Sequence, residues 1–297
     1  MAHDVGHVLG KQTEYRFTYD PGILAREPRV RNRQMYGFDN DHLPFAAGYD
    51  TWHAYECSFL LETGLPVNGV LKMVVPATSE YIVESKSFKL YLFSFNMQPL
   101  GKTRAEAIDR FVETVTNDLS ELLGTRVTVG FYTEADASAM LSTDTFLNEA
   151  RPLEDITSDL EKIAFNTFNE DPRILRFGNN QSLFIFSDML RSNCKITHQP
   201  DWGTVFVYMR SLEPGIDPDS LAQYIVSFRG ENHFHEEIVE CMYTRLWEKF
   251  KPKELMVTAL YTRRGGIDIC PTRASSTELL PQQLIDAHTL TLKDYRQ

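Results

Sequence analysis

The pattern that most constrains the fold is a helix that runs directly into a strand, and its clearest copy lies in the first half of the chain. Thr103 and Glu106 have the spacing of a capping box, in which side chains satisfy the free backbone N–H groups at a helix start. Apolar residues then recur at helical intervals until Gly124. Residues 126–133 follow at once and are rich in β-branched and aromatic side chains, so they predict a strand.

The same pattern returns in the second half. Residues 221–250 carry a long helical pattern with an expected interruption at Gly230, and residues 256–262 after them have the composition of a strand. Laid on the first strand, this run matches at two of seven positions, a Tyr-Thr pair that ends both. The repeated order predicts an α+β protein of two similar modules, each a short antiparallel sheet backed by helices.

The remaining segments divide around these helices. A polar arm of about 40 residues comes first and is expected to pack on the first module. Residues 134–160 are polar and lack a clear period, so they are the expected link, and the modules are placed at residues 1–150 and 151–297. Other runs have the composition of strands, the third of them continuing into an apolar stretch of undecided type: residues 51–61, 67–75, 81–92, 183–186 and 204–209.

Composition and charge limit the classes of partner. The formal charge is -11, from 41 acidic and 30 basic residues, which opposes binding of a phosphate backbone over a broad surface, so no direct nucleic-acid partner is expected. No run approaches the roughly 18 apolar residues that a membrane span needs. Four widely spaced cysteines fit free thiols in a reducing compartment. The expected location is the cytoplasm.

Two nucleotide-binding signatures are missing from the sequence. It contains neither the dinucleotide-binding G-x-G-x-x-G nor the P-loop G-x-x-x-x-G-K-[ST], so a phosphorylated cofactor would need another kind of site. Arg263 and Arg264 precede Gly265 and Gly266, where backbone amides could approach an anion. A plain turn at the end of a strand explains the glycines equally well.

Residues 192–203 (SNCKITHQPDWG) place a thiol, an imidazole and a carboxylate in one short loop. Cys194 is the most reactive of these groups, although a lone cysteine is more often a small buried residue than a nucleophile. Cys194 and His198 also form, with His233 and His235, a set of the type that binds zinc. That spacing is a weak signal, because residues two apart on a helix point in different directions and a histidine on a solvated face is the simpler reading.

Four motifs in order resemble one family. They are residues 84–91 (ESKSFKLY), the cysteine loop, residues 234–236 (FHE) and residues 261–266 (YTRRGG). Together they resemble the long, two-module form of the NADPH-dependent 7-cyano-7-deazaguanine reductases, the nitrile reductases of queuosine biosynthesis. The resemblance covers essentially the whole chain.

The resemblance implies a fold and an assembly. It implies a tunnelling fold (T-fold) of two tandem modules and a homodimer, with sites where modules meet. The first module would carry the Glu-Ser-Lys motif and the second the cysteine. The implied reaction reduces the nitrile of 7-cyano-7-deazaguanine to 7-aminomethyl-7-deazaguanine with two equivalents of NADPH and no metal.

The resemblance also assigns roles to residues. Cys194 would add to the nitrile carbon as a covalent nucleophile, with Asp201 as proton donor and His235 helping to move protons. The donor role needs a protonated carboxyl, and an apolar setting beside Trp202 is expected to raise the pKa of Asp201. The implied binding residues fall into two groups: Val83, Glu84, Ser85, His235 and Glu236 for the substrate, and Ser85, Lys86, Arg264 and Gly265 for NADPH.

Other readings stay open at this point. Glu84 and Glu236 could be ordinary surface-helix glutamates, and Lys89 could be structural. The main alternative function is a zinc-dependent, cyclohydrolase-like hydrolase on the same fold, with Cys194, His198 and His235 as ligands. A non-catalytic pterin- or purine-binding module is a third. The other three thiols, outside the motifs, are expected in cores: Cys57, Cys241 and Cys270.

Overall fold

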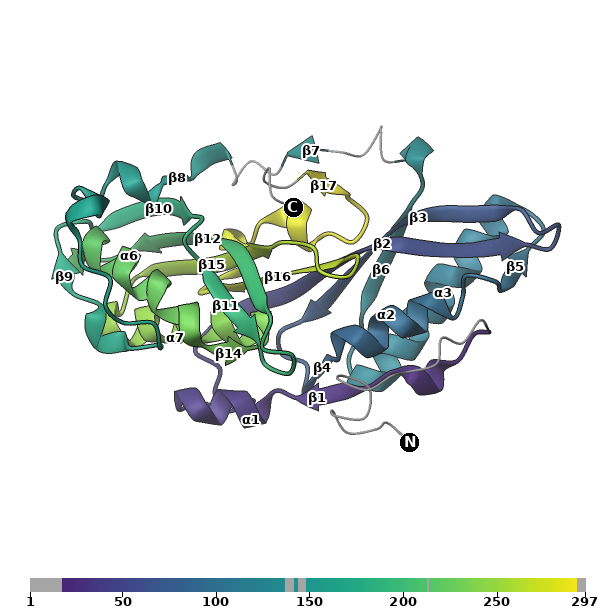
Figure 1. The fold of residues 1–297 in the computed structure, drawn as a ribbon, viewed down its shortest axis with the longest axis horizontal. Helices are drawn as coiled ribbons and strands as arrows, with labels where there is room; N and C mark the ends of the chain where they lie inside the picture. Colours follow the sequence, from purple (N-terminus) through teal and green to yellow (C-terminus); the bar gives the residue numbers. More distant parts are fainter. Residues whose placement is uncertain (1–17, 137–141, 144–147, 213, 293–297) are drawn as a thin grey trace.

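The computed structural model describes residues 18–136, 142–143, 148–212 and 214–292. One large sheet runs through both halves of the chain in the order β14-β11-β12-β15-β16-β2-β3-β6, with shorter strands attached at its side (Figure 1). Its longer strands are β2 (Ala47–Leu61), β3 (Pro66–Pro76), β6 (Thr128–Tyr132), β10 (Ser182–Ser187), β12 (Pro200–Arg210), β15 (Glu254–Tyr261) and β16 (Ile267–Ala274). The short strands are β1 (Arg26–Pro28), β4 (Tyr81–Val83), β5 (Pro99–Gly101), β7 (Ser142–Thr143), β8 (Arg151–Pro152), β9 (Phe177–Gly178), β11 (Arg191–Cys194), β13 (Gly215–Ile216), β14 (Asn232–His233) and β17 (Thr291–Leu292).

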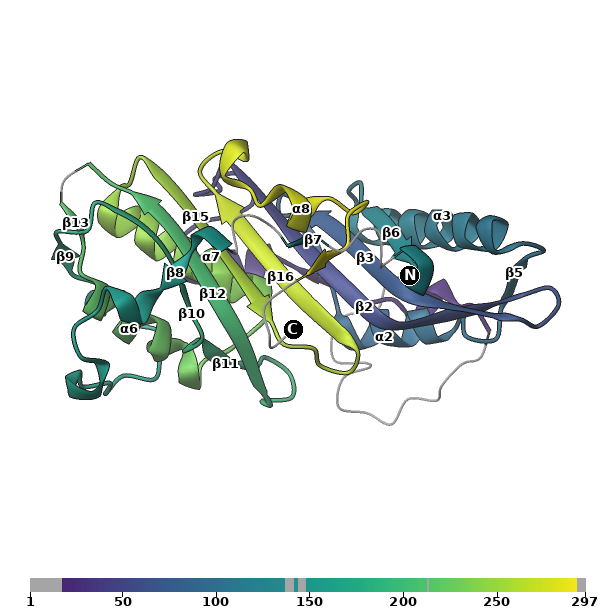
Figure 2. The same ribbon diagram turned by 90° about the horizontal axis from the view of Figure 1, so that it is seen from above.

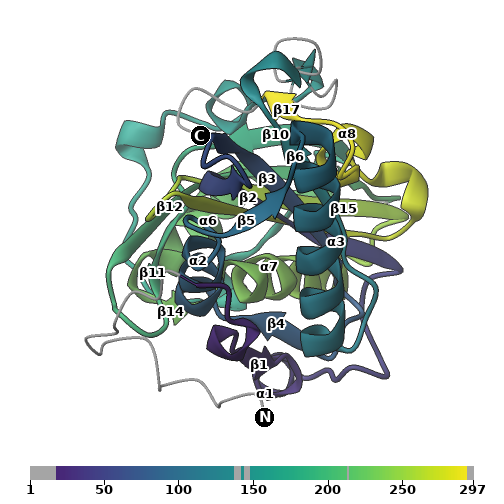
Figure 3. The same ribbon diagram turned by 90° about the vertical axis from the view of Figure 1, so that its right-hand side faces the viewer.

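Four helices lie on one face of this sheet. Figures 1 and 3 show α2 and α3 beneath the strands of the first half and α7 beneath those of the second, with α6 beside it. The short helix α8 lies on the opposite face, as the view from above shows (Figure 2). The helices are α1 (Val30–Arg33), α2 (Ser85–Phe93), α3 (Arg104–Leu123), α6 (Pro218–Ser227), α7 (His235–Phe250) and α8 (Gln282–Ile285). Mixed α+β structure with antiparallel strands backed by helices is therefore confirmed.

Helix α3 forms for the reasons that the sequence suggests. The Thr103 hydroxyl accepts a hydrogen bond from the Glu106 N–H at 3.2 Å, and Gly124 ends the helix with a φ of 62°. The predicted apolar stripe faces the sheet, and its residues Phe111, Val115 and Leu119 are fully buried. Burial of this stripe, rather than helix propensity alone, holds the helix in place.

The second helical run is divided, as expected near Gly230. Helix α6 ends at Ser227, a short 3-10 turn follows to Gly230, and strand β14 intervenes before α7 begins at His235. A side chain at Gly230 would have its Cβ 2.3 Å from the Phe168 carbonyl oxygen, so this close approach requires glycine. The interruption matters for the site, because it puts residues 232–236 at the start of a helix and not within one.

The two halves repeat one order of elements, two strands, two helices and a strand. Strand β6 follows α3 and pairs antiparallel with β3, and strand β15 follows α7 and pairs antiparallel with β12. This supports laying residues 256–262 on residues 127–133. The sheets of the two halves are also joined, because β16 of the second half pairs with β2 of the first along eight residue pairs and makes one continuous sheet.

The arm differs from its expected place. Strand β1 pairs with β4 of the first half, but α1 lies beneath α7 of the second half, so the arm packs on both (Figure 1). Cys57, Cys241 and Cys270 are buried, as predicted for core thiols. Part of the expected link, residues 137–141 and 144–147, lies outside the described residues. Within the described ranges, no helix is both long and apolar enough to cross a membrane.

Candidate active site

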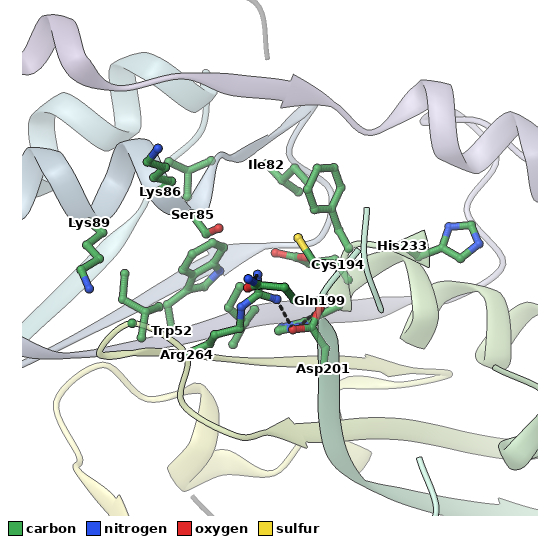
Figure 4. A pocket seen from close by; sticks show the side chains of 17 residues that line it. Trp52, Ile82, Ser85, Lys86, Lys89, Cys194, Gln199, Asp201, His233 and Arg264 are labelled. Carbon is green, nitrogen blue, oxygen red and sulfur yellow. Dashed lines mark hydrogen bonds and ion pairs between the residues drawn. The ribbon is translucent and has the colours of Figure 1, made fainter. Parts of the chain in front are cut away.

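A cavity of about 330 Å³ lies on the helix-covered face of the sheet, where β2 and β16 join the two halves. Apolar side chains of these strands form part of its wall: Trp52, Ile267 and Ile269. Figure 4 shows Ser85 and Lys86 on one side of it and Cys194 and Asp201 on the other. The structure thus brings together residues from four motifs that are distant in the sequence, and a cavity of this size and mixed lining suits a small ligand.

The cysteine segment is a β-hairpin and not a free loop. Cys194 ends strand β11, and its backbone bonds close the turn, with Cys194 N–H to Gln199 O at 2.8 Å and His198 N–H to Cys194 O at 3.0 Å. His198 takes a φ of 54°, which the turn requires. Asp201 lies in strand β12, so its position is set by the sheet. Cys194 is partly exposed to the cavity, unlike the other three thiols.

Asp201 is paired with Arg264 and His235. Its carboxylate accepts a hydrogen bond from Arg264 Nη1 at 2.5 Å and lies 3.4 Å from His235 Nε2. Burial raises the pKa of the Asp201 carboxyl, but His235 and then Arg264 outweigh burial and hold it below its usual range. Trp202 does not supply an apolar setting, because adjacent strand residues face opposite sides and its ring is 40% exposed. The expectation of a raised pKa at Asp201 is wrong.

Arg264 also lies beside the thiol. Its Nη2 donates to Thr197 Oγ1 at 2.7 Å, which holds the guanidinium across the hairpin. Burial alone would lower the pKa of Arg264, but Asp201 and Cys194 raise it. The sequence motif indicated only a cofactor contact for Arg264, and its contacts with Asp201 and Cys194 come from the structure.

His235 is held by an aromatic stack that sequence reasoning missed. Its ring lies parallel to that of Tyr261, with centroids 3.7 Å apart and an interplanar angle of 3°. Gly203 on the neighbouring strand leaves room for this tyrosine, since a Cβ there would lie 3.2 Å from the ring. Tyr261 lies in the YTRRGG motif, but the sequence indicated only that this residue matches Tyr132. The stack fixes the plane of the imidazole that faces Asp201.

Glu84 lies where a helix cap is needed. Its carboxylate accepts hydrogen bonds from the backbone N–H groups of Lys86 at 2.8 Å and Ser87 at 2.7 Å, and it is 3% exposed. Val83, Ser85 and Lys86 line the cavity, but Glu84 is not among its lining residues. The surface-glutamate reading is therefore wrong for Glu84, and the structure shows a capping role that the sequence did not suggest.

Glu236 does line the cavity. It lies in the first turn of α7 and is 3% exposed, so the surface-glutamate reading is wrong here too. Burial, followed by the negative charge of Asp50, raises the pKa of Glu236 to about 8, against the attraction of Arg29 and Arg273. In the unliganded protein the carboxyl is thus largely protonated near neutral pH.

The proposed zinc ligands do not assemble. His233 is buried between Glu237 at 2.9 Å and Glu231 at 3.0 Å, and although burial lowers its pKa, these two glutamates raise it overall. His198 Nδ1 lies 2.8 Å from the Asn232 side chain. Among the described residues, the only three potential ligands within ion-binding range of one another are a different set, His53, Asp268 and Cys270.

The cation-rich side of the cavity fits a phosphorylated ligand. Lys86, Lys89 and Arg264 line it, and so does Gly265, whose φ of 62° favours glycine. A Cβ at Gly265 would lie 3.0 Å from Lys89 Nζ, so the glycine leaves this ammonium space. Lys89 also lies 3.4 Å from Glu56, a partly exposed pair of little energetic weight.

Comparison with known proteins identifies the family. Residues 15–131 match the family described as "Nitrile reductase, 7-cyano-7-deazaguanine-reductase N-term", and residues 200–279 match the family "QueF-like protein". A protein of Colwellia psychrerythraea named NADPH-dependent 7-cyano-7-deazaguanine reductase is 38% identical over 92% of this chain and 93% of its own length. The chain belongs to the 7-cyano-7-deazaguanine reductase family.

Reductases from two other organisms agree with this membership. Reductases of the same name from Acinetobacter baumannii and Chromohalobacter salexigens are 34% and 36% identical, each over 93% of this chain and at least 94% of their own length. Among solved structures, the archaeosine synthase QueF-Like in its apo form matches with a TM-score of 0.29 and 19% identity, covering 34% of this chain and 92% of that one. Members of the reductase family therefore match over almost the whole chain, including both sides of the cavity.

Proposed function

We propose that this protein reduces the nitrile of 7-cyano-7-deazaguanine to 7-aminomethyl-7-deazaguanine with NADPH, as part of queuosine biosynthesis. The observation that carries the proposal is the placement of Cys194 in a cavity beside Arg264 and the Asp201–His235 pair. The cavity is also large enough for a purine-sized base, and one side of it is cationic. Relatives of that name over almost the full length support the choice.

Cys194 is proposed as the nucleophile. Its thiolate adds to the nitrile carbon, so that a C–S bond forms while the C≡N bond becomes C=N, and the nitrogen takes up a proton. The product of this step is a covalent thioimide. The Arg264 guanidinium interacts with the Cys194 side chain and supports this step by holding the sulfur in the cavity.

The Asp201–His235 pair is proposed as the proton source. Because Asp201 is held ionised by its partners in the unliganded protein, it cannot donate alone there. The imidazole of His235 can carry the proton and share it with the carboxylate across 3.4 Å. Transfer to the nitrile nitrogen then needs Asp201 to release its contact with Arg264, which we place at the stage when ligands fill the cavity.

NADPH, when bound, supplies a hydride at each of the two reduction steps. Ser85, Lys86, Arg264 and Gly265 are proposed to hold it, with Lys86 and Arg264 neutralising its phosphates. Cys194 leaves between the two steps, so the second reduction acts on a free imine. The role of the cations is to place the cofactor against the nitrile side of the cavity.

Glu236 is proposed to read the base. A carboxylate can accept two N–H groups of the pyrimidine edge at once, and Glu236 lines the cavity near Cys194. Val83, Ser85 and His235 would add contacts to the ring. Glu84, predicted as a second reader, is proposed to act through α2, since its oxygens already bond the backbone there.

Mass spectrometry of the protein with the nitrile alone tests the covalent step. The wild type should gain one substrate mass, on the peptide that contains Cys194, and Cys194→Ala should gain none. Asp201→Asn should form the adduct at least tenfold more slowly, because the proton source is broken. An unmodified wild-type mass at saturating nitrile would refute the covalent mechanism, while NADPH oxidation that depends on the nitrile would still support the reductase.

Assembly and location complete the proposal. The protein is proposed to be a cytoplasmic homodimer that has no direct nucleic-acid partner. The family resemblance, the charge of -11 and the four free thiols support this. The division into modules at residues 1–150 and 151–297 is proposed with it. Sedimentation equilibrium at micromolar concentration tests the dimer, and a monomer that retains full activity would exclude any need for it.

A further inference from the structure

The segment of residues 25–36, here called the strap, touches both halves of the site. It contains strand β1 and helix α1 and runs along the underside of the helix layer (Figures 1 and 3). Three of its polar side chains, Arg29, Asn32 and Arg33, are buried. Buried polar groups require hydrogen-bond partners. The contacts of these side chains therefore show which parts of the molecule the strap holds in place.

At one end the strap holds the start of α2. The Ala25 carbonyl accepts the Glu84 N–H at 2.9 Å, and the Ala25 N–H donates to Ser87 Oγ at 3.0 Å. Strand β1 continues this contact by pairing with β4, with Arg26 opposite Val83. The strap is thus bonded directly to the segment that presents Val83, Ser85 and Lys86 to the cavity.

At the other end the strap reaches the residue that follows the nucleophile. Lys195 Nζ donates a hydrogen bond to Asn32 Oδ1 and lies 3.2 Å from Glu237 Oε1. Lys195 follows Cys194, and Glu237 follows Glu236. One ammonium group therefore links the end of β11, the first turn of α7 and the strap.

A second link lies one turn further along α7. Arg33 bonds both oxygens of Glu240, at 3.0 Å and 2.7 Å, and its side chain is completely buried. The Tyr36 hydroxyl lies 3.2 Å from His233 Nδ1, close to the start of the same helix. A bidentate, buried pair has little freedom, so α7 is held at a defined position relative to the strap.

We propose that the strap sets the distance between the two halves of the active site, and that Asn32 is a positioning residue that acts on Cys194 through Lys195. The proposal rests on Cys194 being the nucleophile, as proposed above. A purely structural arm would need only its ion pairs and apolar contacts. The Asn32–Lys195 contact fixes the residue that directly follows the reacting cysteine, and a displacement of about 1 Å at the reacting atom can slow a reaction by about a hundredfold.

A double-mutant cycle tests the link. Asn32→Ala, Lys195→Met and the double variant are compared by the rate at which the nitrile forms its adduct at saturating concentration. If Asn32 acts through Lys195, each single change slows the reaction about tenfold or more, and the double variant is no slower than the worse single one. If the rate losses of the two single variants multiply in the double variant, the proposal is overturned. An Asn32→Ala variant that reacts at the wild-type rate would overturn it as well.

Two further variants separate positioning from folding. Asn32→Asp keeps an oxygen acceptor for Lys195 and should restore most of the rate. Arg31→Ala changes an exposed side chain of the same short helix and should leave the rate unchanged. Thermal midpoints are measured for all variants, and a rate loss that follows only the midpoint would count against positioning. A wild type that forms no adduct refutes the covalent mechanism itself, which is a separate outcome.

Discussion

At the scale of single residues, the proposed base-reading role of Glu236 predicts that ligand binding depends on pH. Its pKa of about 8 means that the carboxyl is mostly neutral at pH 7, whereas a base that offers two N–H donors needs the carboxylate. Binding below pH 8 must therefore release a proton. We expect the affinity of Cys194→Ala for the nitrile to rise by up to about tenfold per pH unit from pH 6 to 8, and then to level off.

Calorimetry in two buffers of different ionisation enthalpy measures both the affinity and the released proton. The matched control is Glu236→Gln in the same Cys194→Ala background, which should bind weakly and without this slope. The background variant removes the thiol, so its ionisation cannot mimic the effect. A flat affinity profile in the presence of Glu236 would contradict the raised pKa.

At the scale of elements, helix α2 depends on its cap. Glu84→Ala leaves two backbone N–H groups without their acceptor, so we expect a loss of about 1 kcal/mol in the free energy of unfolding. Because α2 carries Ser85 and Lys86, the KM for NADPH should rise as well. Urea unfolding and steady-state kinetics with each substrate varied in turn measure these effects.

The same variant decides between two roles for Glu84. A residue that only reads the base would raise the KM for the nitrile and leave the unfolding free energy unchanged. Thr103→Ala is the comparison, since it removes the cap of α3, away from the cavity, and should cost a similar free energy without changing either KM.

At the scale of the whole molecule, a buried ion network joins the halves. Arg273 of β16 is fully buried and bonds Asp50 of β2 and Glu240 of α7, both at 2.8 Å. Arg273→Met removes the positive charge that lies beside both carboxylates, so we expect a loss of about 3–5 kcal/mol in the free energy of unfolding. Urea unfolding at pH 7 measures it, and Arg173→Met, at an exposed pair, should cost almost nothing.

The same buried ion network makes the stability of the fold depend on pH in the acid range. Burial raises the pKa of Asp50 and of Glu240, but their arginine partners outweigh burial and lower both. Such carboxylates stabilise the fold above their unfolded pKa of about 4, and this contribution is lost as the pH falls through the lower folded values. The Arg273→Met variant should therefore begin to unfold at a higher pH than the wild type in an acid titration.

Local features of the fold could be predicted because short-range forces determine them. The cap of α3 at Thr103 and the spacing of its apolar stripe depend on residues within one or two turns. The residues of the four motifs could also be named, since each motif is contiguous. The undecided apolar stretch of residues 81–92 shows the limit, because strand β4 passes into α2 there and the capping carboxylate of Glu84 was not recognised.

Long-range pairing could not be predicted in the same way. Asp201 was expected to be protonated because its neighbour in sequence is Trp202, yet the partners that lower its pKa, His235 and Arg264, lie 34 and 63 residues away. The register of β12 on β15, with Gly203 opposite Tyr261, brings these groups together. The pKa of a carboxyl group depends on the residues around it in space, whereas the sequence shows only the residues beside it along the chain.

The sequence by itself determined the α+β class and the repeated order of elements, and it named the candidate reacting groups, since local propensity and contiguous motifs carry that information. Only the tertiary structure decided that β16 and β2 join the halves into one sheet, and that residues 25–36 bind both sides of the cavity. The tertiary structure also decided in which direction the pKa values of the buried carboxyl groups at the cavity shift. Pairing across hundreds of residues depends on the packed chain, because electrostatic and hydrogen-bond energies depend on distances in space.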